Sequence, residues 1–100
     1  MIYITQLIYL NEGQEDTFNK FEEVAIPIIS KYNGRLLLRL RPGQDAVIEK
    51  SIDLPYEIHL VEFPSNEDFE AFKRDDERIN FLHLKEQSIK SALLIRGQQT

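Results

Sequence analysis

Two segments of the chain carry polar side chains in alternation with apolar ones, RLLLRLR at 35–41 and YEIHLVEF at 56–63. Alternate residues of a β-strand share one face of a sheet. If the two segments pair as strands, one face gathers the charged members of both. These members are Arg35, Arg39, Arg41, Glu57 and His59.

This combination of residue types can bind an anion or a carbonyl compound and move a proton. Arg39 can hold a carboxylate through two nitrogens, with Arg41 beside it, while His59 acts as acid or base and Glu57 orients the imidazole. The more polar face of the first strand adds further candidate binding residues: Tyr3, Thr5 and Tyr9. The alternative hypothesis is a cross-strand salt-bridge cluster that binds no ligand and lies at a subunit interface or on a wet sheet surface.

Other kinds of chemistry have no support in the sequence. There is no cysteine, which excludes disulfides, thiolate metal sites and a cysteine nucleophile. The two histidines are far apart in sequence, and the acidic residues gather where helices begin, so we predict no metal site. Phosphate-binding glycine motifs and the GxSxG elbow are missing, and we predict no cofactor.

Length and charge limit the organisation and the partners. The chain has 100 residues, which predicts one domain over 1–97 and a frayed tail over 98–100. The net charge is −5 and no basic stripe is present, so nucleic acid is not an expected partner. No segment has the length of a membrane span or the pattern of a signal peptide, and we expect a cytoplasmic protein with no membrane partner.

Hydrophobic periodicity and turn signals give the element order. Asn11 is a plausible N-cap of the first helix, Asn33-Gly34 a helix stop, Pro64 a strand stop and Ser65 an N-cap. The predicted elements are strand 2–10, helix 12–32, strand 35–41, strand 56–63, a helix after Ser65, a second helical start at 75–77 and strand 92–96. This order predicts an α+β, ferredoxin-like βαββαβ fold, a four-stranded antiparallel sheet with helices on one face.

Covering of the second sheet face predicts a homodimer. The first strand, 2–10, is apolar on both sides, so each of its faces should be covered. One possible arrangement packs the leucine face of 36–40, with Tyr56, Ile58 and Leu60, on the helices, and the sequence does not decide which sheet face carries the pocket. The charged face would then point toward the partner sheet or toward a pocket between the two subunits.

Several short motifs resemble a known family. They are Lys31-Tyr32-Asn33-Gly34-Arg35, Val61-Glu62-Phe63-Pro64-Ser65, Phe72, Glu77 and the terminal strand that ends in Gly97. In these the chain resembles the dimeric α/β-barrel superfamily and, within it, domain-of-unknown-function family 1330. Where that family usually has Ser-Pro-Glu-Tyr, this chain has Asp75-Asp76-Glu77-Arg78 and keeps only the Glu. The resemblance implies the fold and a homodimeric α/β barrel, and no agreed activity.

The sequence leaves three functions open. The first is a small homodimeric protein that binds an anionic or carbonyl compound in a pocket on the charged sheet face. The second is a cofactor-independent monooxygenase of the antibiotic-biosynthesis type, which shares the dimeric barrel and which Phe72 and His83 resemble in part. The third is a non-catalytic interaction module. An enzyme should show a closed pocket with convergent polar groups, and a module an exposed apolar patch.

Overall fold

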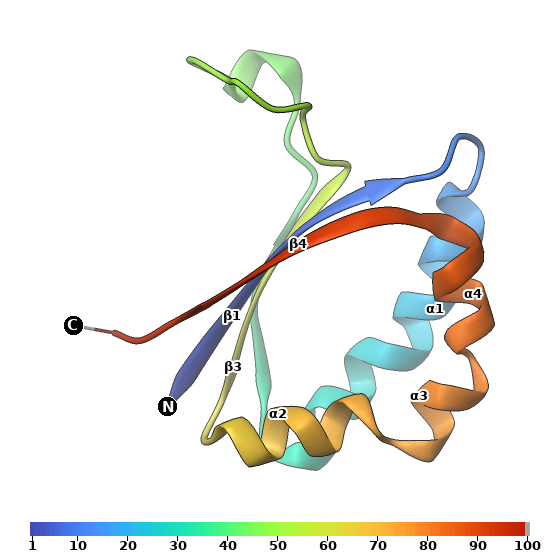
Figure 1. Cartoon of the computed structure of the whole chain (residues 1–100), viewed down its shortest axis with the longest axis vertical. Coiled ribbons are helices and arrows are strands. Elements are labelled where there is room, and N and C mark those ends of the chain that lie inside the picture. The colour runs from blue at the N-terminus through green and yellow to red at the C-terminus, as the bar shows by residue number, and fades with distance from the viewer. Residues whose placement is uncertain (100) are drawn as a thin grey trace.

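A four-stranded antiparallel sheet carries its α-helices on one of its faces (Figure 1). The computed structural model describes residues 1–99. The strand order is β2-β3-β1-β4, with β1 and β3 in the centre. The predicted α+β, ferredoxin-like fold is confirmed.

The elements follow the predicted order along the chain. The strands are β1 (Ile2–Leu10), β2 (Arg35–Leu40), β3 (Glu57–Phe63) and β4 (Ile89–Gly97). The helices are α1 (Glu15–Ile28), α2 (Asn66–Lys73), α3 (Asp76–Asn80) and α4 (Leu82–Ser88), with the 3₁₀ turns η1 (Ile29–Tyr32) and η2 (Gln44–Ala46). The final strand is longer than the predicted 92–96. The predicted tail covers residues 98–100, of which Thr100 lies outside the described residues.

Helix ends form largely where the sequence predicts them. The Ser65 hydroxyl accepts a hydrogen bond from the Asp68 N–H at 3.2 Å and caps α2. Asp75 caps α3 in the same way, because its Oδ1 accepts from the Arg78 N–H at 3.0 Å. The Asn11 prediction is wrong: α1 begins after Gln14, and the Asn11 side chain instead donates to the Gln87 carbonyl at 3.0 Å.

The helix layer covers the hydrophobic core. On α1, the buried stripe is Phe18, Phe21, Glu22, Ala25 and Ile28. A buried apolar cluster joins the sheet to η1 and α2 through Ile4, Ile29, Val61, Phe63 and Phe69. Because Val61 and Phe63 alternate with Ile58 and Leu60 along β3, their burial decides which face of this strand lies under the helices.

The charged face lies under the helices, which excludes the arrangement with the leucine face packed on them. Glu57 and His59 share the face of Val61 and Phe63 and are buried, with 0% and 5% of their surface exposed. The sequence pattern grouped residues of like polarity but did not decide which of the two faces meets the helices. The aromatic and β-branched residues at the end of β3 determine the covered face, and the charges are buried with them because they neutralise one another.

An irregularity in β2 places its leucines on both faces. The register shifts between Leu36, which pairs with Val61, and Leu38, which pairs with Leu60. Leu36 therefore packs against the core, while Leu38 lies on the face without helices and is 47% exposed. Arg39 pairs with His59 and follows the covered face.

The predicted tyrosine and threonine site residues lie apart from the charged cluster. On β1, Gln6 pairs with His59 and Ile8 pairs with Glu57, which places these two residues on the helix-covered face. Tyr3, Thr5 and Tyr9 alternate with Ile4, Gln6 and Ile8 and occupy the open face instead. The prediction that one face unites them with the charged residues is wrong.

None of the helices in residues 1–99 has the length and apolar character needed to cross a membrane. The cytoplasmic location stays a prediction.

Candidate functional site

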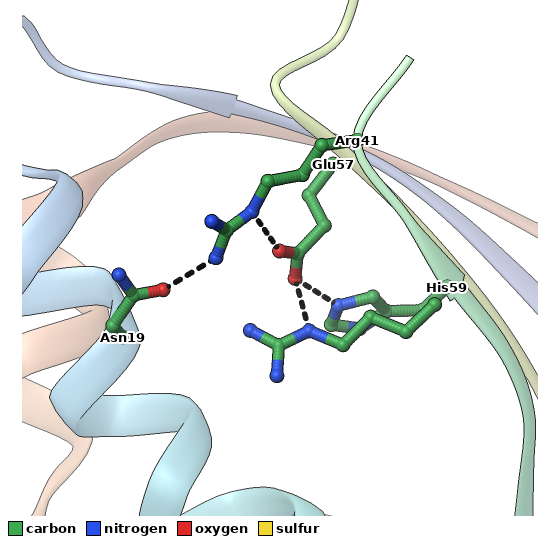
Figure 2. A network of polar contacts seen from close by, with 5 residues as sticks. Asn19, Arg41, Glu57 and His59 are labelled. Carbon is green, nitrogen blue, oxygen red and sulfur yellow. Dashed lines mark hydrogen bonds and ion pairs between the residues drawn. The ribbon is translucent and has the colours of Figure 1, made fainter.

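A carboxylate at the start of β3 is the centre of a polar network beneath α1. Glu57 Oε2 accepts from Arg39 Nε at 2.8 Å and from His59 Nε2, and Glu57 Oε1 accepts from Arg41 Nε at 2.9 Å. Arg41 Nη2 continues the network to Asn19 Oδ1 on α1 at 2.8 Å (Figure 2). The predicted residues Arg39, Arg41, Glu57 and His59 therefore lie together, and they connect the sheet to α1.

The charges of this network are largely fixed by its own hydrogen bonds. Burial alone would raise the pKa of Glu57, but the hydrogen bonds from Arg39, His59 and Arg41 outweigh it and lower the pKa. The pKa of His59 is lowered, chiefly by burial and against the attraction of Glu57. Near pH 7 an ionised Glu57 can only accept, so a neutral His59 donates Nε2–H to it and keeps Nδ1 as an acceptor.

This occupancy limits what Glu57 can do chemically. Both of its oxygens have donors, and two of the donors are guanidinium groups. A carboxylate with its lone pairs engaged in this way is a weak base, so its role is to neutralise the arginines and to orient His59. Of the predicted catalytic pair, His59 alone lines the cavity described next.

A cavity of about 70 Å³ lies between the helix layer and the sheet. Most of its wall is apolar and comes from β1, β3, β4, α1, η1 and α2. Five of its lining residues carry polar groups: Gln6, Glu22, His59, Arg78 and Lys85. A small, mostly apolar cavity with a few convergent polar groups has the general form of a small-molecule site.

Glu22 brings a carboxyl group to this cavity from the buried stripe of α1. It is 7% exposed, and the charges nearest to it act through space, since no hydrogen bond contributes to its pKa. Burial raises the pKa of Glu22 from its ordinary 4.5 to about 7, against the attraction of Arg39, Arg78 and Lys85. Near neutral pH this carboxyl group therefore exists in both protonation states.

Arg78 brings a guanidinium group that lacks one of its partners. Its Nη1 donates to the Lys73 carbonyl at 3.0 Å, while Nε is buried and has no hydrogen-bond partner among residues 1–99. The guanidinium lies over Phe72, 5.1 Å from the ring centroid, and its pKa is lowered by burial. Its backbone N–H is the group that Asp75 caps, and Asp75 Oδ2 also accepts from the Tyr32 hydroxyl at 2.7 Å. Asp75 therefore fixes the helix that positions Arg78.

Lys85 completes the polar set from α4. Its pKa is lowered by burial, and Arg78 contributes to that shift through like-charge repulsion. The charges of Arg78 and Lys85 act to lower the pKa of Glu22, and the charge of Glu22 acts to raise the pKa of each of them. The three groups therefore lie in one electrostatic neighbourhood. Opposed charges from three helices thus face one cavity.

Glu22, Arg78 and Lys85 were not among the residues predicted from the sequence. A signal existed for Glu22, which occupies a position of the apolar stripe one turn after Phe18. No comparable signal existed for Arg78 and Lys85. The helical region after Asp75 is divided at Phe81 into two short helices, which removes the single periodic face that the spacing of Ile79, Leu82 and Glu86 predicts.

Comparison with known proteins gives the family and the fold. The sequence profile of a family described as "Domain of unknown function (DUF1330)" matches residues 6–98. The chain belongs to the DUF1330 family. The predicted resemblance to this family is confirmed. A comparison with curated proteins found no significant match.

Solved structures share the fold at low sequence identity. A protein of unknown function from Rhodopseudomonas palustris, RPA0582, aligns with a TM-score of 0.82 at 13% identity, over 99% of this chain and 82% of that chain. Atu4242 from Agrobacterium tumefaciens aligns with a TM-score of 0.73 at 20% identity, over 100% and 94% of the two chains. A Nitrosomonas europaea protein named "Putative antibiotic biosynthesis monooxygenase" aligns with a TM-score of 0.69 at 8% identity, over 99% and 98%. At these identities the likeness establishes the fold alone.

Proposed function

We propose that this DUF1330 protein binds a small carboxylate or carbonyl compound in the cavity between the charged sheet face and the helices. The single observation that carries the proposal is that Arg78 lines the cavity and has a buried Nε–H with no hydrogen-bond partner among residues 1–99. Leaving a buried donor unsatisfied costs about 1–3 kcal/mol, and more for a charged group. A ligand oxygen at this position would satisfy the donor.

The surroundings of Arg78 support an anionic ligand. Lys85 lines the same cavity, and a protonated Glu22 can donate a hydrogen bond to a ligand oxygen instead of repelling it. His59, held by Glu57, offers a further polar atom on the sheet side. Arg39 and Arg41, which the sequence predicted as ligand-binding residues, neutralise Glu57, and the charge of Arg39 also acts on Glu22.

A thermal-shift comparison of wild type with Arg78→Met and Lys85→Met tests the binding function. A panel of short carboxylates, aldehydes and ketones is added to each protein, and Arg74→Met is the matched control because Arg74 is exposed on the adjoining turn. A ligand at 100 times its Kd stabilises the folded form by about 2.7 kcal/mol, which a domain of this size shows as a rise in Tm of roughly 10 °C or more.

We expect at least one compound to raise the Tm of wild type and of Arg74→Met, and to lose this effect in Arg78→Met and Lys85→Met. The shift is compared within each variant, because Arg78→Met also loses the bond to the Lys73 carbonyl and has a lower starting Tm. Equal shifts in all four proteins would place the ligand elsewhere. No shift in wild type across the panel would overturn the proposal.

We also propose that two copies associate through the open sheet face. This face carries the apolar side chains Leu7, Leu38, Leu40, Ile58, Leu60, Leu93 and Ile95. Leu93 and Ile95, at the β4 edge of this surface, are 52% and 48% exposed, and their apolar neighbours on the same face are partly buried. A contiguous apolar surface of this kind is covered in the functional protein, and a second sheet packed face to face covers it with like side chains.

Sedimentation or light scattering on Ile95→Glu tests the dimer. The matched control is Ile79→Glu, because Ile79 is also 48% exposed but lies on α3 in the helix layer. We expect wild type and Ile79→Glu to have twice the mass of the chain, and Ile95→Glu to have the mass of one chain. A monomeric wild type would refute the proposal.

The other two predicted functions receive less support from the geometry. His83, the histidine invoked for a monooxygenase, is exposed, stacks on Phe81 at 6.4 Å and does not line the cavity. The exposed apolar patch expected of an interaction module is present, but it coexists with the polar cavity, and a homodimer accounts for the patch.

A further inference from the structure

We propose that the cavity enolises a bound 2-oxo acid, with Glu22 as the group that takes the proton from C3. This inference rests on the binding function proposed above and adds a substrate class and a reaction to it. Its basis is the set of groups that face one cavity: a carboxyl from α1, a guanidinium from α3 and an ammonium from α4. Proton abstraction next to a carbonyl needs a base of this kind and cations near the oxygen.

Glu22 is suited to act as the base because nothing else uses its carboxylate. Glu57, whose charge also acts on Glu22, has three donors on its two oxygens, whereas the pKa of Glu22 has no hydrogen-bond contribution. A general base is most effective when its pKa lies near the working pH. Burial raises the pKa of Glu22 to about 7, so at neutral pH it can both accept a proton and return it.

The two cations are suited to separate roles. Arg78 lines the cavity and has a buried Nε–H without a partner among residues 1–99, while the Asp75 cap holds its backbone and the Lys73 carbonyl holds its Nη1, which favours directional binding of the substrate carboxylate. Lys85 is a compact charge on the same wall, and its ammonium can stabilise the negative charge that develops on the ketone oxygen. Both lie in a buried region, where such interactions are stronger than in water.

The size of the cavity restricts the substrate. A water-sized group needs about 10–15 Å³ of cavity volume. A cavity of about 70 Å³ therefore accommodates a molecule about as large as pyruvate or 2-oxobutyrate. Phe63, on the sheet side of the wall, offers no hydrogen-bond partner and suits the short alkyl end of such a substrate, whereas Phe21 and Phe72 lie next to the Arg78 guanidinium.

The reaction balances without any further reactant. The Glu22 carboxylate takes a proton from C3, the C–H electron pair becomes the C2–C3 double bond, and the carbonyl π electrons move to oxygen beside Lys85. The product is the enolate of the bound 2-oxo acid. Reversal from a Glu22 carboxyl group that has exchanged with solvent returns a solvent hydrogen to C3, so the net change is hydrogen exchange.

Proton NMR of pyruvate in deuterated buffer measures this exchange as loss of the methyl signal. The rate is compared for wild type, Glu22→Gln and, as the matched control on the same helix, Glu23→Gln, whose side chain is exposed. Pyruvate binding to each protein is measured separately by calorimetry, and 2-oxobutyrate is run in parallel. A protein-free sample gives the background rate.

We expect wild type and Glu23→Gln to accelerate exchange above background. Glu22→Gln should accelerate exchange about 100-fold less than wild type, which is the lower end of what a general base contributes, and should still bind pyruvate. Binding without protein-dependent exchange, or equal exchange in Glu22→Gln, would overturn the reaction and leave the binding function intact. Binding of other carboxylates but of neither 2-oxo acid would overturn the substrate class. If no carboxylate or carbonyl compound binds, the proposed function itself fails.

Discussion

Replacement of Glu22 by Gln changes how the stability of the protein depends on pH. Gln has nearly the same shape as a protonated Glu but cannot ionise. In the folded protein the pKa of Glu22 is about 7, whereas in the unfolded chain it returns to about 4.5. Between these values the folded state holds one more proton than the unfolded state, so the free energy of unfolding of wild type falls as pH rises.

The size of the effect follows from the two pKa values. At 1.36 kcal/mol per pH unit, a rise from 4.5 to about 7 amounts to about 3 kcal/mol. The wild-type protein begins to lose this stability above pH 4.5, and the loss is complete once the pH is well above 7. Relative to wild type, Glu22→Gln should therefore gain about 3 kcal/mol between pH 4 and pH 8.5. The facing charges, Arg39, Glu57, Arg78 and Lys85, are present in both proteins and largely cancel in the difference.

Urea unfolding at a series of pH values measures this difference. With an m-value of about 1–3 kcal/mol per molar urea, the midpoints of the two proteins should separate by roughly 1–3 M. One protein concentration is kept throughout, because association changes apparent stability. Glu23→Gln, with an exposed side chain on the same helix, should show a constant difference from wild type. A constant difference for Glu22→Gln as well would refute the burial argument for this carboxyl group.

Two further predictions concern the sheet. Glu57→Gln should lower the free energy of unfolding by about 2 kcal/mol. This is less than the roughly 3–5 kcal/mol lost when a fully buried pair is broken, because Arg39 and Arg41 remain 32% and 49% exposed. Glu62→Gln, which breaks the exposed pair with Arg35, should lower it by less than about 1 kcal/mol. Equal losses in the two variants, measured by urea unfolding at pH 7, would contradict this. Gly34→Ala should cost about 1–3 kcal/mol, because a Cβ there would lie 2.6 Å from Phe63 Cε1 and 2.8 Å from Ile29 Cγ2, while Gly97→Ala meets nothing within 4 Å and should be neutral in the same assay.

The fold could be predicted because its signals are local. Ser65 and Asp75 cap helices with their own side chains, and Pro64 and the Asn33-Gly34 pair follow the ends of β3 and η1. Asn33 adopts a left-handed φ of 66°, which ends the helical segment as its type predicts. Such features need only a few consecutive residues, so the element order follows from the sequence without knowledge of tertiary contacts.

The covered face of the sheet could not be predicted in the same way. Alternation shows that Arg39, Glu57 and His59 share a face, but not whether that face meets helices, solvent or a partner. The outcome depended on Val61 and Phe63, which continue the same face of β3 and are buried by the helix layer. The irregularity after Leu36 then reversed the remaining leucines of β2, a change that the leucine pattern itself does not reveal.

The cavity residues depend on contacts between elements that are distant in sequence. Glu22 could be recognised as a carboxyl in an apolar stripe, but its partners come from α3 and α4, more than two elements later in the chain. Arg78 faces the cavity because Asp75 starts a new helix there and Tyr32 and Lys31 bond to Asp75. Only the packed structure brings these three helices together.

The most direct test of the ligand site is to observe the Nε–H of Arg78 itself. Two-dimensional proton–nitrogen NMR resolves arginine Nε–H groups, and Arg78→Met and Arg74→Met assign the signals of Arg78 and of an exposed control. On titration with pyruvate, the Arg78 Nε–H signal should move downfield with saturation as the buried donor gains an oxygen partner, while the Arg74 signal stays in place. An Arg78 signal that stays unchanged while pyruvate and the other short carboxylates and carbonyl compounds are added would contradict the account.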